Sequence, residues 1–344
     1  MNAVNDTRRA PAHPTHKFQL LLRREFWEHK GGFLWSPIWA GAISLGLTLM
    51  ALLVGEVMMR KAIARGDLQI DGHVMVNGLN IGALTSKMSP EDARQLAGGI
   101  DLSLLMTSSW PLIVLAFVVF FYCLGALYDE RKDRSVLFWK SLPVSDTETV
   151  LSKAVSATVV APALAVGAAL VTMLGFLVVL SLFVLAHGGN PLRLLWGPAR
   201  PFEIAAQLVA SIPVYALWSL PTVGWLLLCS AWARSKPFLW AIMIPVFAGI
   251  FVSWFDLMQL FNLESAWFWK NVVARVLLSG VPGSWMEVAH VHNVHVDGPA
   301  DVMRLINLRT MWSTLLTAQL WLGAVAGAAM IALATRLRRW RDEG

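Results

Sequence analysis

Six long apolar stretches divide the chain, and polar segments separate them. A helix that crosses a lipid bilayer needs about 20 mostly apolar residues. The stretches that reach or nearly reach this length are 33–58, 102–127, 154–186, 204–232, 237–255 and 311–335. We therefore predict an all-α, polytopic membrane protein with six transmembrane helices, in which residues 1–344 form a single domain.

Two junctions between these stretches carry turn and capping signals. Only Ala233-Arg234-Ser235-Lys236 separates the fourth stretch from the fifth. Pro237 disfavours one merged helix, because proline has no amide hydrogen to donate inside a helix. Ser145 and Glu148 have the spacing of a capping box, so a helix is expected from about residue 146 to 186. That helix either bends at Pro162 or projects its first turns out of the membrane.

The segment 15–32, which precedes the first span, has the pattern of an amphipathic helix. Phe18, Leu22 and Phe26 recur every four residues, and charged residues fall on another face. Such a helix is expected to lie along the membrane surface. Its role stays open between an elbow that transmits motion from a partner and a passive surface helix.

Lysine and arginine are distributed unequally between the two sets of polar segments. One set holds 17 of them in 71 residues: 1–32, 128–153, 233–236 and 336–344. The other set holds 11 in 115 residues: 59–101, 187–203 and 256–310. Because Lys and Arg accumulate on the cytoplasmic side, we predict that both termini are cytoplasmic and that 59–101 and 256–310 are extracytoplasmic loops.

Composition agrees with a membrane protein. Apolar types make up 56 % of the chain and charged residues only 15 %, against roughly a quarter in soluble domains. The net charge of +6 comes from residues that flank apolar segments, and so no nucleic-acid partner is expected. Cys123 and Cys229 lie in apolar runs and are expected to be free. No apolar core of signal-peptide length precedes Phe33, so no cleaved signal is expected.

The polar segment 128–153 contains more apolar surface than a solvated loop needs. A short helix is expected over 134–141, with Val136, Leu137 and Trp139 beside a charged rim. Exposed apolar surface with a charged rim is typical of a docking site. On these residues alone, a docking site and a segment that dips into the lipid headgroups are equally good interpretations.

The same segment resembles the first cytoplasmic loop of type-2 ATP-binding-cassette (ABC) export permeases. In that family the loop commonly runs Glu-Arg, Gly-Thr-Leu-Glu, Ser-Leu-Pro-Val-Ser, Thr-Glu and Gly-Lys. This chain departs from the pattern at Arg134, Leu137 and Ser152. The matching residues are Glu130-Arg131, Ser135-Val136, Ser141-Leu142-Pro143-Val144-Ser145, Thr147-Glu148 and Leu151-Ser152-Lys153.

The resemblance implies the permease subunit of an exporter in the cell (inner) membrane, paired with a second copy of itself and two ATPase subunits. It also implies an N-terminal elbow helix and a re-entrant segment before the last span, where Pro282 and Gly283 would break a helix. Val136, Leu137 and Trp139 would fill a pocket of the ATPase, and Arg131 and Arg134 would pair with carboxylates at its rim. The coupling residues would be Glu130, Arg131, Asp133, Arg134, Ser135, Val136, Leu137 and Trp139.

No Gly-x-x-x-x-Gly-Lys-[Ser/Thr] pattern occurs in the sequence. We therefore expect no cofactor in this chain, with ATP and Mg bound by the partner subunit, and no enzymatic activity of its own. The patterns of metalloproteases and serine hydrolases are absent too. His290, His292 and His295 stand near Asp297 in an arrangement that could bind a metal, but a merely polar loop explains them as well.

The spans contain few ionisable groups, which disfavours an ion-coupled carrier and favours an apolar or amphiphilic cargo. The cargo itself is not specified by the sequence. A membrane assembly or sensory module without transport is the alternative function. Residues that could line a pathway, or equally pack helices together, are Ser108, Ser109, Tyr215, Ser219, Thr222, Thr314 and Thr317.

Overall fold

A computed structural model of the chain describes residues 14–65, 89–135, 141, 144–259, 264–287, 298–299, 301–302 and 306–340. These residues form helices joined by turns, and no strand occurs among them. The prediction of an all-α membrane protein is confirmed by six helices that are long and apolar enough to cross a membrane. They are Gly31–Ala62, Glu91–Lys132, Asp146–Ala186, Pro201–Trp218, Pro237–Leu257 and Ala318–Trp340.

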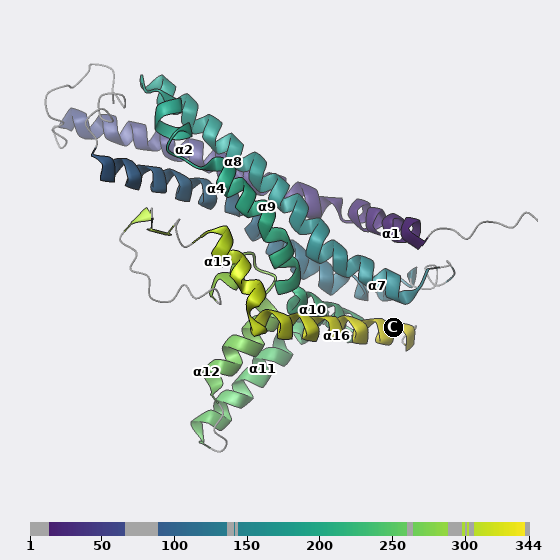
Figure 1. The fold of residues 1–344 in the computed structure, drawn as a ribbon. Helices are drawn as coiled ribbons and strands as arrows, with labels where there is room; N and C mark the ends of the chain where they lie inside the picture. Colours follow the sequence, from purple (N-terminus) through teal and green to yellow (C-terminus); the bar gives the residue numbers. More distant parts are fainter. Residues whose placement is uncertain are drawn as a thin grey trace, which may run out of the picture.

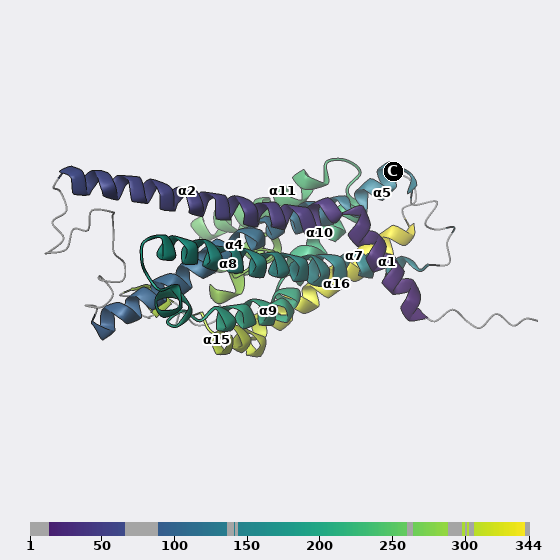
Figure 2. The same ribbon diagram turned by 90° about the horizontal axis from the view of Figure 1, so that it is seen from above.

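The N-terminal part consists of a short helix joined to the first span. Helix α1 (Pro14–Glu28) covers most of the predicted amphipathic segment. A π-helical turn, η1 (Gly31–Trp35), then leads into α2 (Ser36–Arg65). The change of direction between α1 and α2 therefore falls close to the glycine pair at the start of the first span (Figure 2).

The second and third spans are longer than their apolar stretches. Helix α4 (Pro90–Gly125) begins well before Leu102, because Ser89 and Asp92 form a capping box on its polar first turn. A short helix, α5 (Tyr128–Lys132), follows it. The predicted capping box of Ser145 and Glu148 is confirmed at the start of α7 (Asp146–Val155), where the Glu148 amide donates to Ser145 Oγ over 3.1 Å.

The third span changes its winding just before Pro162. A π-helical turn, η2 (Ser156–Val160), joins α7 to α8 (Ala161–Ala186). Proline removes one helical donor, and a wider turn ahead of it accommodates the missing hydrogen bond. After η3 (Leu192–Trp196) the chain enters the fourth span.

The fourth span is two helices rather than one. Helix α9 (Pro201–Trp218) ends at Ser219, and α10 (Leu220–Trp232) begins with Pro221 in its first turn. The expected turn between the fourth and fifth spans is present: Lys236 adopts a left-handed conformation with φ of 50° immediately before α11 (Pro237–Leu257).

The segment before the last span is a series of short helices: α12 (Ser265–Phe268), η4 (Trp269–Val273), α13 (Ala274–Leu278), η5 (Ser284–Glu287), α15 (Leu308–Ser313) and η6 (Thr314–Leu316). The last span, α16 (Ala318–Trp340), begins later than residue 311. The reason is a backbone break at Thr317, which is extended with φ of −86° and ψ of 136°.

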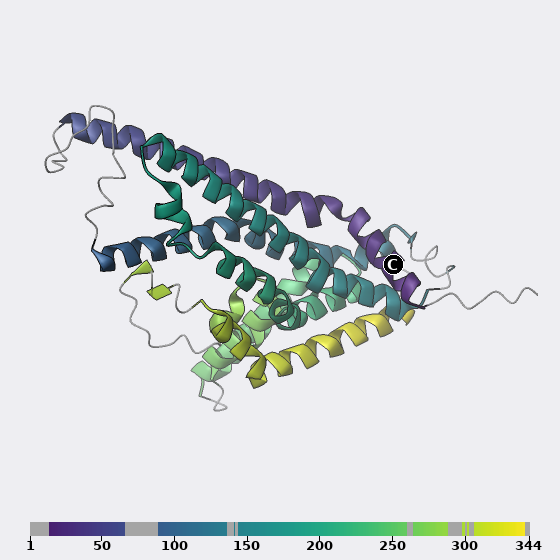
Figure 3. The same ribbon diagram turned by 45° about the horizontal axis from the view of Figure 1, so that its top comes forward.

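Helices α2, α4, α8 and α9 run side by side, and α16 packs on α10 (Figures 1 and 3). Figure 1 shows α11 and α12 leaning away from this bundle. Helix α1, the start of α7 and the last turns of α16 lie together at one end (Figure 2). We call the end formed by α1, α5, the start of α7 and the last turns of α16 the basic end.

Small residues allow the closest helix crossings. A β-carbon on Gly327 of α16 would clash with the backbone at Leu220, and one on Gly224 of α10 would clash with the backbone of Gly327. In the same way, Gly41 of α2 leaves room for the Thr172 hydroxyl of α8. Close backbone approach at small residues is a usual way for helices to associate within a membrane.

Candidate functional site

A buried network of charged side chains joins the helices at the basic end. Its centre is Lys153 of α7, which is 2 % exposed. The Lys153 ammonium lies 2.9 Å from Glu25 Oε1 of α1 and 3.0 Å from Glu130 Oε1 of α5. The second contact is an ion pair without hydrogen-bond alignment. One lysine therefore holds two carboxylates from two other helices.

The network continues from both carboxylates. Tyr122 of α4 donates its hydroxyl hydrogen to Glu25 Oε2 over 2.7 Å. Glu130 also receives the guanidinium of Arg338 from α16, whose Nε lies 3.2 Å from Asp146 Oδ1. Arg24 approaches Glu130 to 3.7 Å. Arg24 also pairs with the half-exposed Glu28 over 3.2 Å, so three cations face four carboxylates, of which Glu25 and Glu130 are buried.

Arg131 makes a second connection beside this network. It is buried, and its guanidinium donates to the carbonyl oxygens of Ser230 and Ala233, the latter over 2.9 Å. The Ser230 hydroxyl donates to the carbonyl of Leu124 and accepts from the amide of Leu127. These bonds connect the end of α4 to the end of α10, just before the turn that starts α11.

The predicted coupling residues therefore divide into two groups. Glu130 and Arg131 are buried among other helices, so in this structure the Arg131 guanidinium bonds within the chain. Asp133 and Arg134 are exposed, and Arg134 has a left-handed φ of 56°. Ser135 is half-buried and donates to the Glu130 carbonyl over 3.3 Å. Val136, Leu137 and Trp139 lie outside the described residues, and coupling to an ATPase stays a prediction.

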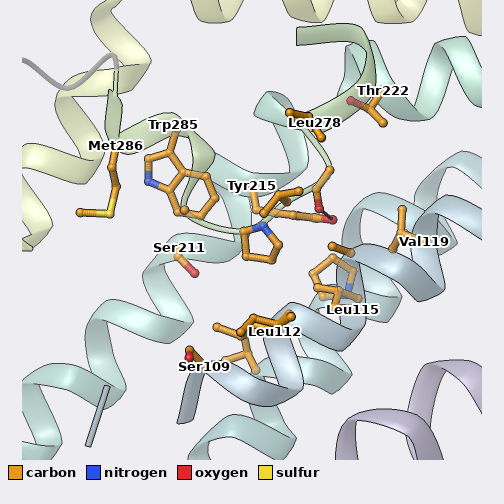
Figure 4. A pocket seen from close by; sticks show the side chains of 18 of the residues that line it. Ser109, Leu112, Leu115, Val119, Ser211, Tyr215, Thr222, Leu278, Trp285 and Met286 are labelled. Carbon is orange, nitrogen blue, oxygen red and sulfur yellow. Dashed lines mark hydrogen bonds between the residues drawn. The ribbon is translucent and has the colours of Figure 1, made fainter. Parts of the chain in front are cut away.

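A cavity of about 850 Å³ lies between the spans (Figure 4). Its walls come from α4, α8, α9, α10 and α11, together with segments 277–286 and 306–311. Most of the lining is apolar, with Leu115, Phe120 and Trp285 as examples. The polar lining residues are Ser109, Gln207, Ser211, Tyr215, Thr222, Asn307 and Thr310.

Three of the predicted pathway residues line this cavity: Ser109, Tyr215 and Thr222. Ser108 and Ser219 are fully buried, and each donates to a carbonyl of its own helix. Such contacts are typical of helix packing.

The two predicted pathway residues near the last span sit at its break. Thr314 is also fully buried, and Thr317 donates to the Thr314 carbonyl over 2.6 Å. Of these four remaining residues, Ser108, Ser219, Thr314 and Thr317, none is among the described residues that line the cavity.

The segment 274–287 packs as a cap on the kinked fourth span. Tyr215 donates to the Gly280 carbonyl over 2.9 Å, and the Trp218 indole donates to Ser284 Oγ over the same distance. Thr222 donates to the Arg275 carbonyl over 3.1 Å. The break between α9 and α10 thus presents three side chains to the cap.

Arg275 anchors this cap to two spans. Its guanidinium carbon lies 3.3 Å from the centre of the Trp218 ring, a cation–π contact. The guanidinium also donates to the carbonyls of Trp218 and Gln319. Burial lowers the pKa of Arg275 to about 10, so the side chain remains charged at neutral pH.

Several residues of these sites were missed by sequence reasoning. Gln207 and Ser211 precede the predicted Tyr215 at steps of four residues on α9, and this spacing could have identified a polar stripe on one helix face. Glu25, Lys153 and Arg338 carried no such signal, because their partners are distant in sequence.

The candidate metal ligands His290, His292, His295 and Asp297 lie outside the described residues. Within the described part of the chain, no three His, Cys, Asp or Glu side chains come together in a way that could hold a metal ion. Both cysteines, Cys123 and Cys229, are buried and free, as expected from their apolar surroundings.

Fold and sites together define a multi-pass helical membrane protein with an apolar cavity between its helices and a buried charge network at one end. No protein-family model, curated protein or solved structure matches this chain. A function for it therefore has to follow from its own residues.

Proposed function

We propose that this chain is the membrane-spanning permease subunit of an ATP-driven exporter, and that a separate ABC-type ATPase subunit supplies the energy. The basic end would then face the cytoplasm of a cell whose inner membrane holds the protein. The distribution of Lys and Arg supports this orientation. The resemblance of segment 128–153 to the coupling loop of type-2 ABC permeases supports the partner.

The observation that carries the proposal is how the loop after the second span is attached. Glu130 connects the start of this loop to α7 and α16, and Arg131 connects it to the end of α10. The next residues, Lys132 to Arg134, are exposed. A partner that pushes on the exposed part would therefore act on four transmembrane segments at once, as a coupling loop must.

The proposed assembly contains two copies of this chain and two ATPase subunits. The sequence has no phosphate-binding loop, and so ATP must bind elsewhere. A single six-helix bundle also supplies only half of the pathway that a symmetric permease would enclose.

The proposal is tested by isolating the affinity-tagged full chain from its native membranes in a mild detergent. We expect an ABC-type ATPase chain to copurify in a one-to-one ratio, and its ATP hydrolysis to increase when the permease is present. Reversing the exposed charges with Asp133→Lys and Arg134→Glu should weaken this association.

Arg339→Glu is the matched control, because Arg339 is exposed at the same end but lies on α16. Equal loss of the ATPase with the control and with the loop variant would show that association depends on exposed charges anywhere at this end rather than on the loop. A chain that purifies without any ATPase, and that stimulates none, would favour the assembly or sensory module.

A further inference from the structure

The cavity between α4, α9 and the cap opens toward the apolar outside of the bundle. Phe117 and Phe121 of α4 line it and are 62 % and 59 % exposed. Leu115 and Trp285 line its inner part and are almost completely buried. A molecule dissolved in the membrane could therefore enter sideways without passing through water.

Charged ligands are disfavoured by the lining of this cavity. None of its described lining residues is Asp, Glu, Lys, Arg or His. An ion that leaves water for such a site loses its hydration and finds no opposite charge in return. The lining therefore favours a ligand without net charge.

Four of the five hydroxyl groups that line the cavity have already donated their hydrogens within the protein. Ser109 donates to the Met106 carbonyl and Ser211 to the Leu208 carbonyl, each over 2.7 Å. Tyr215 and Thr222 donate to carbonyls of the cap. Each oxygen keeps a lone pair that can accept, so these four groups offer the cavity acceptors rather than donors. Figure 4 shows Ser109 and Ser211 reaching the cavity from different helices.

Gln207 has an acceptor without a partner. Its side chain is nine-tenths buried and contributes to the cavity wall, and its Oε1 makes no hydrogen bond. The amide is oriented with Nε2 3.4 Å from Glu203 Oε1, where it can donate, and this orientation leaves Oε1 as the unpaired atom. A buried acceptor left unpaired is unfavourable, and a donor supplied by a ligand would satisfy it.

We propose that this cavity binds a neutral amphiphile with an apolar body and a head that donates hydrogen bonds, such as a hydroxyl-bearing lipid. The α9 stripe of Gln207, Ser211 and Tyr215, with Ser109 of α4, accepts the donors, and the apolar lining holds the body. The volume of about 850 Å³ is within the range of roughly 300–1,000 Å³ for ligand pockets. That such a molecule is the exported cargo rests on the proposed function, whereas the binding itself does not.

The test measures binding to the purified full-length permease without any ATPase. The probe is 1-monopalmitoyl glycerol that carries a photoreactive diazirine in its chain, with crosslinked peptides located by mass spectrometry. Two unlabelled competitors are compared with unlabelled 1-monopalmitoyl glycerol. One is its dimethyl ether, which has no donors, and the other is its phosphate, which is anionic.

We expect crosslinks in α4, α9 and the cap. The dimethyl ether should displace the probe at least fivefold less well than monopalmitoyl glycerol, since one hydrogen bond to a buried acceptor contributes about that factor. The phosphate should also displace it at least fivefold less well, because its charge loses hydration in an apolar cavity. Equal displacement by the dimethyl ether would overturn the donor requirement. Preferred binding of the phosphate would overturn the neutral head.

Variants localise the effect to the cavity. Gln207→Leu should weaken probe binding about five- to tenfold, whereas Gln95→Leu, on α4 outside the cavity, should not. Ser211→Phe should abolish crosslinking by filling the space, whereas Val209→Phe places the same side chain on the exposed side of α9 and should not. If the cavity variant and its control weaken probe binding equally in either pair, the inference fails. Copurification of an ATPase is measured separately on the same proteins, and so a failure of binding is distinguishable from a failure of the proposed function.

Discussion

Lys153 offers the sharpest test of the buried charge network. Lys153→Met keeps an unbranched, apolar stem of similar length and removes the ammonium. That ammonium lies 2.9 Å from Glu25 Oε1 and 3.0 Å from Glu130 Oε1. Glu25 is 1 % exposed, so water cannot replace the lost partner without opening the interface between α1 and α7.

The size of the effect follows from this geometry. Without Lys153, the buried carboxylate of Glu25 loses its ammonium partner, and the cluster carries one more uncompensated negative charge. Removal of one partner from a buried ion pair destabilises proteins by about 3–5 kcal/mol. Tyr122 still donates to Glu25 and Arg338 still pairs with Glu130, so the lower part of this range, about 3 kcal/mol, is expected here.

The assay is equilibrium unfolding of the purified permease in mixed micelles, followed by tryptophan fluorescence as the denaturing detergent is increased. Arg60→Met is the matched control, because Arg60 pairs with Glu56 on the surface of α2 and its side chain is 66 % exposed. Exposed pairs contribute about 0.2–1 kcal/mol. The double variant Lys153→Met, Glu25→Gln restores the net charge of the cluster and should recover about half of the lost stability.

The reasoning is refuted if Lys153→Met costs no more than Arg60→Met. It is also refuted if Glu25→Gln added to Lys153→Met destabilises the protein further. In that case the network would not be held by the compensation of charge, and α1 would dock on α7 through its apolar residues alone.

Three further predictions concern the helix crossing, the cap and the topology. Gly327→Leu should prevent α10 and α16 from packing and lower the yield of folded protein severely, whereas Gly46→Leu, with open space around it, should be tolerated; size-exclusion chromatography compares them. Arg275→Met should destabilise the cap by about 1–3 kcal/mol, measured as faster proteolysis within 274–287. With both native cysteines replaced by serine, Trp340→Cys should resist an impermeant thiol reagent added outside intact cells, and its labelling there would reject cytoplasmic termini.

The number and positions of the spans could be predicted because the bilayer sets a minimum apolar length. The predicted helix limits were less accurate in two situations. In one, a helix begins in polar residues before its apolar stretch, and in the other the backbone breaks within the stretch. Helix α4 starts at a capping box that precedes its apolar stretch, and the sixth apolar stretch is interrupted at Thr317. The break at Ser219 was missed because both sides of it are equally apolar.

The capping box of Ser145 and Glu148 was predicted correctly because its two partners are three residues apart. The charge network was not predicted, since Lys153 and Glu25 are separated by 128 positions and Glu130 and Arg338 by 208. Neither pair belongs to a periodic pattern. Such contacts depend on how α1 and α16 pack against α7, which an amphipathic or apolar pattern does not specify.

The first two residues of the loop motif, Glu130 and Arg131, are buried rather than exposed. The resemblance to type-2 ABC permeases implies that Glu130 and Arg131 share in the contact with an ATPase, and this contact stays a prediction. Their side chains are buried and bonded to other parts of the same chain, and Lys153, at the end of the same motif, is a partner of Glu130. Buried ion pairs contribute little net stability, but they hold helices in one relative position because any other position leaves a charge unpaired. The motif therefore fixes the base of the loop to the spans. The residues that follow this fixed base, Lys132, Asp133 and Arg134, are exposed.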